Sequence, residues 1–347
     1  MVNVSRASKW GVLLVAGTLV ACVSNGPKPS SAKSSGMPDW VENEPNQSGH
    51  VYGVGSAPVY VDQAKALQQA QDAARVSMIQ KLKVTVTGSL SQDIQETRRT
   101  GQATEIVKTV RNQITSRIPQ AELDNLEVEE NYVDKKNKVA YALVHLDRRR
   151  ASSNLRQRIA DLDMQVTSLS DRVPDNLATL KQLQGLMPAL KWLSQREKLT
   201  EQLVLVDMNN RGVQKDEMLT NAESRINQLF DRLQVSLVAK NDAAKRVRAG
   251  LSKSLTDLGL RLGNSGADLT IEYSANLREV EKGGRYIVFA DGQVDIKDGA
   301  GRVLSSVREE AKGVSAASME QGRYKAVEQL GNKLGGVIAA SFVSFID

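Results

Sequence analysis

The sequence has a single cysteine, Cys22, among its 347 residues. A lone thiol cannot form a disulfide within the chain, so the folded domains must be held together by core packing. Aromatic residues make up only 4% of the chain, which leaves few surfaces on which bases or sugars could stack. The formal net charge of +6 is modest, and two of the basic residues, Arg6 and Lys9, lie near the N-terminus. Because nucleic-acid binding needs a clustered basic face, we expect no nucleic-acid partner.

Histidine is almost as scarce, and this bears on metal and catalytic chemistry. His50, in an expected loop, and His145, in an expected strand, have no cysteine or second histidine at metal-ligand spacing. The motifs of serine hydrolases, β-lactamases and zinc proteases are absent as well. The sequence therefore predicts no metal, no cofactor and no catalytic residue, and it favours a protein that is not an enzyme. An enzyme of an unrecognised type is the remaining alternative.

The first 21 residues have the pattern of a secretory signal. Two basic residues precede an uncharged apolar run over residues 10–20, and the small residue Ala21 comes directly before Cys22. The run is shorter than the roughly 20 apolar residues that a membrane span needs. An ordinary secretory signal followed by a chance cysteine is the alternative to a lipoprotein signal.

The stretch Leu19-Val20-Ala21-Cys22 resembles the lipobox of bacterial lipoproteins. The resemblance implies cleavage before Cys22, diacylglycerol on its thiol and an acyl chain on the new amino group. Cys22 would then be the lipidation site, and these chains would anchor the protein to the lipid bilayer. Val23 stands where an Asp usually retains a lipoprotein in the inner membrane. We therefore expect the protein on the periplasmic face of the outer membrane.

Residues 22–36 comprise the lipidated cysteine and a tether. From residue 23 onward the segment consists almost entirely of Ser, Pro, Gly, Lys and Asn, which is typical of a flexible linker. A flexible coil of this length spans about 20 Å. It would lift the folded part off the membrane without fixing its orientation.

Residues 37–147 predict a small α+β domain. Strands are expected at residues 51–57, 83–90, 126–133 and 139–146, and helices at 61–82 and 100–117. The first helix has an apolar stripe and many alanines, which would let it lie close against a sheet. Gly53 and Gly55 precede this helix, but Pro58 stands where the dinucleotide fingerprint needs its third glycine. We therefore expect the two glycines to allow a close backbone approach or a bulge.

These residues also carry a family resemblance. Pro38-x-Trp40, the stretch from Tyr52 to Gly55 and an alanine-rich helix ending near Arg75 look like those of the Lpp-twenty lipoproteins. That family is named for a twenty-kilodalton outer-membrane antigen, and it includes lipoproteins that build outer-membrane rings around flagella. The resemblance implies an envelope role and carries over no catalytic residue. This chain extends well beyond the matching region.

Residues 148–233 predict a helical hairpin or a three-helix stalk. Apolar residues from Leu155 to Val173 alternate at spacings of four and three, which forms a heptad seam. Pro174 is expected to end this helix. The seam in helix 155–173 either packs within the chain or mediates self-association, and the pattern leaves both open.

The rest of this segment contains two further helices and an arginine cluster. Asp175 and Asn176 are candidate caps for a second helix, Pro188 is expected to kink or break it, and residues 217–233 predict a third. The segment opens with five arginines, Arg148, Arg149, Arg150, Arg156 and Arg158. They form either a solvated helix start or a contact for anionic lipid or peptidoglycan.

Residues 234–347 predict a second α+β domain with the order β-α-β-β-β-α. The expected strands are 235–239, 269–281, 286–297 and 303–307, and the expected helices are 242–258 and 315–345. Glycine-containing turns separate the last three strands, which predicts a three-stranded meander with helices on one face. Phe342, Phe345 and Ile346 are expected in the core.

Taken together, the patterns predict an α+β protein in which two small α+β sandwich domains are joined by a helical hairpin or stalk. We expect a structural or assembly role in the cell envelope, with envelope or flagellar ring proteins as partners. The alternative within the same compartment is a lipoprotein regulator of a periplasmic cell-wall enzyme.

Overall fold

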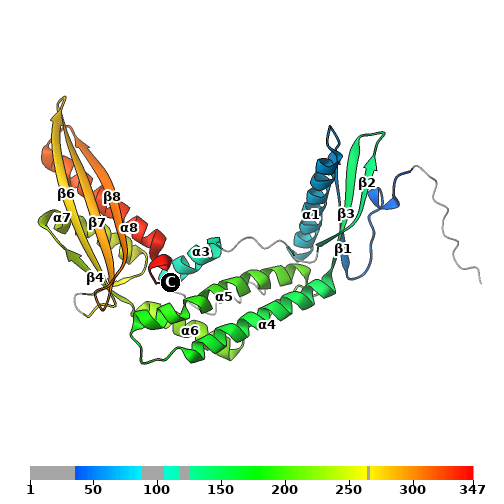
Figure 1. Ribbon diagram of the computed structural model, residues 1–347, viewed down its shortest axis with the longest axis horizontal. Helices are drawn as coiled ribbons and strands as arrows, with labels where there is room; N and C mark the ends of the chain where they lie inside the picture. The colour runs from blue at the N-terminus through cyan, green and yellow to red at the C-terminus, as the bar shows by residue number, and fades with distance from the viewer. Residues whose placement is uncertain (1–35, 88–104, 118–122, 124–125, 264–265, 347) are drawn as a thin grey trace, which may run out of the picture. The chain divides into compact units, whose positions relative to one another are not determined.

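A computed structural model describes residues 36–87, 105–117, 123, 126–263 and 266–346 (Figure 1). The chain divides into two compact units, Met1–Met37 and Pro38–Asp347, and all elements below belong to the second. In chain order they are η1 (Asp39–Val41), β1 (His50–Pro58), α1 (Gln63–Thr87), α3 (Glu105–Arg117), β2 (Leu126–Asp134), β3 (Val139–Asp147), α4 (Arg148–Arg172), α5 (Thr179–Val206), α6 (Glu217–Arg232), β4 (Gln234–Ala239), α7 (Asp242–Asp257), β5 (Arg261–Leu262), β6 (Leu269–Lys282), β7 (Arg285–Asp298), β8 (Val303–Ser315) and α8 (Met319–Ile346). The predicted α+β class in two parts is confirmed. The domain boundaries at 147/148 and 233/234 stay predictions.

The first sheet is antiparallel, with the order β1-β3-β2, and α1 covers one of its faces. Gly53 and Gly55 lie against the backbone of α1, and a Cβ on Gly55 would lie 2.2 Å from the amide nitrogen of Ala74. Ala70 and Ala74 are fully buried at this contact. The predicted close backbone approach is therefore confirmed, and small residues on both elements make it possible.

The strand predicted at residues 83–90 is wrong as far as the described residues reach, because α1 continues to Thr87. Met78 and Leu82 extend the buried stripe of the helix, so its C-terminal half is held by packing. The β-branched residues that follow disfavour a helix by only a few tenths of a kcal/mol each. Val84 is exposed, as expected where no neighbouring strand covers it. Residues 88–90 lie outside the described residues.

The helix predicted at residues 100–117 is present as α3, but it does not pack on the first sheet. Its apolar side chains Ile106, Val110 and Ile114 belong to the core that contains α5, α6 and α8. The side-chain amide of Gln113 donates to the carbonyl of Ala339 in α8 at 2.6 Å. The stripe on α3 was readable from the sequence, whereas the surface it covers depends on contacts with residues far along the chain.

An ion-pair cluster fixes α3 to α6. Arg111 pairs with Glu223, whose second carboxylate oxygen accepts from the ammonium of Lys215 at 2.5 Å. Burial raises the pKa of Glu223, but the charges of Arg111 and Lys215 outweigh it and hold that pKa below its usual value. The carboxylate is therefore charged and doubly paired near neutral pH.

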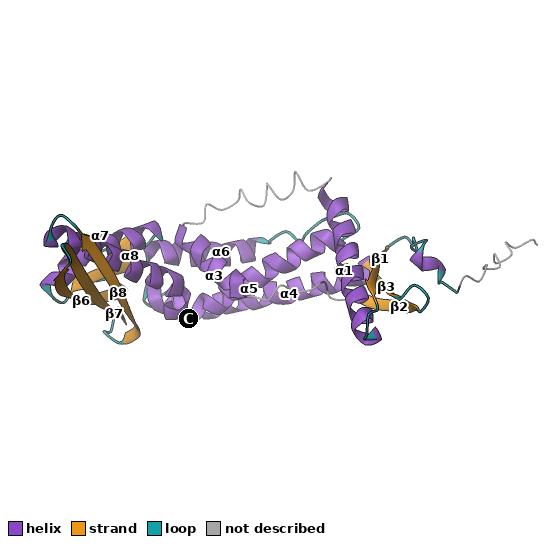
Figure 2. Cartoon of the chain, turned by 90° about the horizontal axis from the view of Figure 1, so that it is seen from above, coloured by secondary structure: helices purple, strands orange, loops and turns teal. Residues whose placement is uncertain are grey.

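The seam on α4 packs within the chain, along α5 (Figure 2). Leu155 and Ile159 belong to the core around α1 and the first sheet, and Val166 belongs to the core of the C-terminal part. Because α5 covers these residues, self-association of helix 155–173 would need a surface other than this seam. Self-association through this helix stays a prediction.

The connection between α4 and α5 differs in two respects from what the sequence predicts. Ala178, which has no capping side chain, precedes α5, so Asp175 and Asn176 are not its caps. Instead, the side-chain amide of Gln182 donates to the carbonyls of Asp175 and Leu177 at 2.9 and 2.7 Å. Helix α5 also continues through Pro188, so of the expected kink or break the break is wrong.

A buried arginine connects α5 to its surroundings. Arg196 is only 3% exposed, and its Nε donates to the carboxylate of Asp163 in α4 at 2.6 Å. Its Nη2 donates to the carbonyls of Val213 and Gln214, both at 3.2 Å. These contacts hold the segment before α6 against the α4–α5 pair.

The second sheet has the order β5-β4-β6-β7-β8. Strand β4 is parallel to β5 and β6, whereas β6, β7 and β8 form an antiparallel meander. Helices α7 and α8 cover one face of it (Figures 1 and 2). The predicted meander with helices on one face is confirmed, and the short β5 is an addition. Phe342, Phe345 and Ile346 are buried as expected.

Candidate functional site

Cys22, the predicted lipidation site, lies outside the described residues, as do the rest of the signal and most of the tether. The sequence evidence for lipidation therefore stands by itself. None of the helices in the described part of the chain has both the length and the hydrophobicity needed to cross a bilayer.

The arginine cluster at the start of α4 is engaged in contacts within the chain. Arg148 donates from Nε and Nη2 to the carbonyls of Val206 and Asp207, at 2.8 and 2.5 Å, and so caps the C-terminus of α5. Arg156 donates to the carboxylate of Asp207 at 2.8 Å. Burial raises the pKa of Asp207, but the bonds from Arg156 and two backbone amides outweigh it and hold that pKa below its usual value. This geometry gives Arg148 and Arg156 a structural role.

The structure brings the two histidines together, contrary to the sequence expectation. His50 lies in β1 rather than in a loop, and its ring centroid is 5.6 Å from that of His145 on the adjacent strand β3. Tyr52 completes this cluster on the sheet face opposite α1, where Trp40 also packs. Within the described residues no group of three or more His, Cys, Asp or Glu side chains is placed to hold a metal ion.

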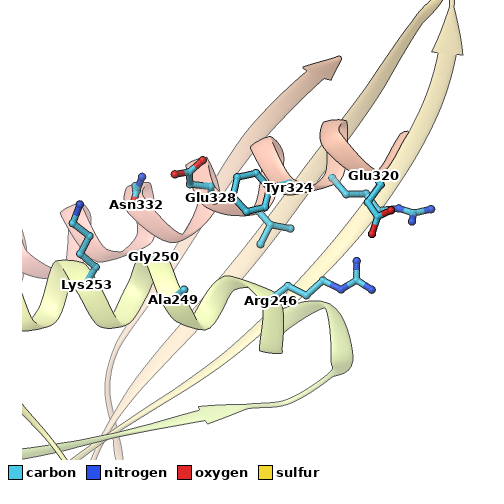
Figure 3. Close-up of a pocket in the computed structure, with 10 residues that line it drawn as sticks. Arg246, Ala249, Gly250, Lys253, Glu320, Tyr324, Glu328 and Asn332 are labelled. Carbon is cyan, nitrogen blue, oxygen red and sulfur yellow. The ribbon is translucent and has the colours of Figure 1, made fainter. Parts of the chain in front are cut away.

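A groove lies between α7 and α8. It has a volume of about 380 Å³ and runs along the helices on the side away from the sheet (Figure 3). The asparagine cap of α7, Asn241, accepts from the amide of Ala244 and donates to the carbonyl of Ala275 in β6, both at 2.9 Å, which fixes the helix to the sheet. A Cβ on Gly250 would lie 3.1 Å from the Cα of Gly331, so the two helices meet backbone to backbone.

The two walls of this groove carry opposite charges. Figure 3 shows Arg246 and Lys253 on α7, and Glu320, Tyr324 and Glu328 on α8. Neither cation forms an ion pair among the residues that the structure describes. Tyr324 is 69% exposed between the charged groups. Such a surface offers complementary contacts to a polypeptide segment that carries both signs, and an exposed tyrosine is typical of binding hot spots.

A further ion pair shapes one end of the groove. Arg323 on α8 pairs with Glu279 on β6, with 2.9 Å between Nη2 and Oε2. The hydrogen bond from Arg323 lowers the pKa of Glu279, and the same bond raises the pKa of Arg323. Because this arginine is already paired, the unpaired positive charge of the groove comes from α7.

Neither the groove nor the histidine pair could be predicted from the sequence. Arg246 and Lys253 are seven residues apart and therefore share a helix face, which a helical-wheel analysis shows. Their relation to Tyr324 depends on how α7 and α8 dock. Likewise, the alternation of β1 and β3 places the histidines on outward faces, but only the strand register makes them neighbours.

Comparison with solved structures finds bacterial proteins of low identity. The secreted protein HP1454 from Helicobacter pylori is 17% identical, with 83% of this chain and 98% of that chain covered and a TM-score of 0.43. A minor lipoprotein from Acinetobacter baumannii is 15% identical, covering 33% and 92%, with a TM-score of 0.26. Lipoprotein GNA1162 from Neisseria meningitidis is 10% identical, covering 30% and 99%, with a TM-score of 0.23. We draw no conclusion from likenesses at these TM-scores.

Comparison with families is more specific. The sequence has no match among curated proteins. The family model of the LPP20 lipoprotein, the Lpp-twenty family named above, matches residues 38–147. This segment contains η1, the first sheet and α1, including the two glycines that lie against that helix. Residues 38–147, about a third of the chain, therefore match the LPP20 lipoprotein family, and this match supports a lipoprotein of the cell envelope.

Proposed function

We propose that the protein is an outer-membrane lipoprotein, anchored through acyl chains on Cys22, with a structural or assembly role in the envelope. The observation that carries the assembly role is the groove between α7 and α8, with cations on one wall and carboxylates on the other. Its exposed charges and tyrosine favour a protein partner over a small cofactor, which usually binds in a mostly apolar pocket. The protein would act by binding rather than by catalysis.

The family match supports the proposed membrane anchor. The family model is one of lipoproteins, and the chain has Cys22 at the position that lipidation requires. Val23 favours the outer over the inner membrane. Flagellar ring proteins and a periplasmic cell-wall enzyme are two classes of partner for the groove, and the identity of the bound protein distinguishes them.

Replacing Cys22 with Ser tests the anchor. We expect Cys22→Ser to accumulate as an unprocessed precursor that carries no label from fed palmitate, because serine has no thiol to receive diacylglycerol. Membrane fractionation should find the wild-type protein in the outer membrane. Normal maturation and labelling of the mutant would show that the chain has an ordinary secretory signal.

Cross-linking from Tyr324 tests the groove. With a photo-reactive phenylalanine analogue at this position, we expect irradiated cells to yield an adduct with an envelope assembly protein, identified by mass spectrometry. The double variant Arg246→Glu/Lys253→Glu should weaken this adduct at least several-fold, because it reverses one wall of the groove.

The matched control places the same analogue at Met164, which is exposed on α4 and does not line the groove. Adducts of equal yield from both positions, or none from position 324, would contradict the proposed binding site. An adduct with a cell-wall synthase would instead support the regulatory role.

A further inference from the structure

Two loops meet at one end of the first sheet. The β1–α1 connection follows Pro58, which pairs with Val139 at the start of β3, just after the β2–β3 turn. The amide of Val59 donates to the carbonyl of Lys138 at 2.7 Å, so the connection is bonded directly to that turn. Figure 1 shows both loops at the same end of the sheet, beside the start of α1. We call Tyr60, Val61 and the three lysines 135, 136 and 138 the basic tip.

The apolar side chains of the basic tip are almost fully exposed. Tyr60 is 86% exposed and Val61 is 98% exposed, and they are adjacent. The loop is nonetheless held on both sides, by the Val59 bond and by Asp62, whose carboxylate accepts from the amides of Ala64 and Lys65 at 2.9 and 3.2 Å. The loop therefore presents an adjacent tyrosine and valine to solvent while its backbone is held in place.

Three lysines lie in the β2–β3 turn, which is bonded to this loop. Lys135, Lys136 and Lys138 are all exposed, and none forms an ion pair among the described residues. The acid of the β2–β3 turn, Asp134, is buried and accepts from the amides of Lys136 and Asn137, both at 2.9 Å. Because its carboxylate fixes the turn, Asp134 is not free to pair with a lysine ammonium.

We propose that the basic tip binds the anionic surface of a phospholipid bilayer. Lysines around exposed apolar side chains are the chemistry that lipid interfaces attract, because the ammonium groups meet lipid phosphates while the apolar groups enter the boundary with the acyl chains. Tyrosine suits this boundary because its ring is apolar and its hydroxyl stays in water. An anionic glycan would satisfy the lysines but would leave Val61 without an apolar partner.

This contact goes beyond the proposed function. The acyl chains on Cys22 would limit how far the folded part lies from the membrane, but they would not set its orientation, because the tether is flexible. The basic tip would supply the orientation by holding one end of the sheet at the surface. The contact needs no partner protein and no acyl chain, so it can be tested separately from both.

The test uses the mature full-length chain with Cys22→Ser, sedimented with vesicles. We expect binding to vesicles of phosphatidylethanolamine and phosphatidylglycerol, and at least about tenfold weaker binding to phosphatidylcholine vesicles. Both Tyr60→Ser/Val61→Ser and Lys135→Gln/Lys136→Gln/Lys138→Gln should weaken binding to the anionic vesicles by about tenfold or more. Their unfolding midpoints should match that of the parent, since all five side chains are exposed.

The control removes three exposed lysines away from the basic tip and from the groove, as Lys181→Gln/Lys282→Gln/Lys325→Gln, which changes the net charge equally. It should bind anionic vesicles within about twofold of the parent. No binding by the parent, an equal loss in the control, or unchanged binding in either tip variant would overturn the proposal. These results leave the cross-link from Tyr324 unaffected, so failure of one proposal is distinguishable from failure of the other.

Discussion

Replacing Gly55 with Ala is expected to destabilise the part of the chain that matches the LPP20 family by at least about 3 kcal/mol. A Cβ at this position would lie 2.2 Å from the amide nitrogen of Ala74 and 2.3 Å from the carbonyl oxygen of Ala70. These atoms belong to the backbone of α1, so no change of rotamer can relieve the clash. The helix would have to leave the sheet, and the buried alanines and Met78 would then lose their packing.

Urea unfolding of the Cys22→Ser chain, followed by tryptophan fluorescence, measures this effect, because Trp40 is buried beside the first sheet. Gly336→Ala is the matched control. Gly336 is an exposed residue of α8 with no atom within 4 Å of an added Cβ. There the same methyl group should stabilise the protein by about 0.5–1 kcal/mol, because alanine favours a helix. A mild effect of Gly55→Ala would mean that α1 and β1 are not in backbone contact.

Arg196→Met is the second substitution with a large expected effect. We expect it to lower the free energy of unfolding by about 3–5 kcal/mol. Methionine fills much of the same space, but it leaves the Asp163 carboxylate and the carbonyls of Val213 and Gln214 without the donors that now satisfy them. Most of the expected destabilisation comes from leaving the half-buried carboxylate of Asp163 without its partner. The segment before α6 would also lose its attachment to α5.

Chemical denaturation again gives the free energy of unfolding. Lys245→Met is the control, because it breaks an exposed ion pair with Asp242 on α7. We expect it to lower the free energy of unfolding by only about 0–1 kcal/mol. The double variant Arg196→Met/Asp163→Asn should recover part of the loss, since it removes the unpaired charge. A loss no larger than that of Lys245→Met would show that Arg196 is solvated rather than buried.

Much of the fold could be predicted because it depends on local periodicity. The meander of the second sheet and helices α4, α6 and α7 follow from alternation, apolar stripes and turns that lie close together in the sequence. The segment 83–87 was mispredicted because β-branched residues favour a strand locally, while the packing of Met78 and Leu82 extends the helix. The placement of α3 failed for a related reason. Its stripe is visible in the sequence, but its partner Ala339 lies more than two hundred residues away.

The candidate site was less predictable than the fold. The expected lipidation of Cys22 depends on a short linear motif and not on folded context, and it stays a prediction. The groove exists only because Gly250 and Gly331 let two helices meet, and neither glycine reveals its partner in the sequence. The arginines at the start of α4 illustrate the converse. Their charge left a solvated helix start and a ligand contact both open, whereas Arg148 binds the end of α5.

One junction in the fold has a mechanical consequence. Strand β3 ends at Asp147 and α4 begins at Arg148, with no residue between them. The carboxylate of Asp147 accepts from the amides of Arg149 and Arg150 at 2.9 and 3.1 Å, so the joint is itself hydrogen-bonded. Tension applied to the sheet from the lipid end of the chain would pass into α4 through this joint instead of stretching a loop. Any compliance of this part of the chain under pulling would therefore come from outside the sheet-to-helix junction.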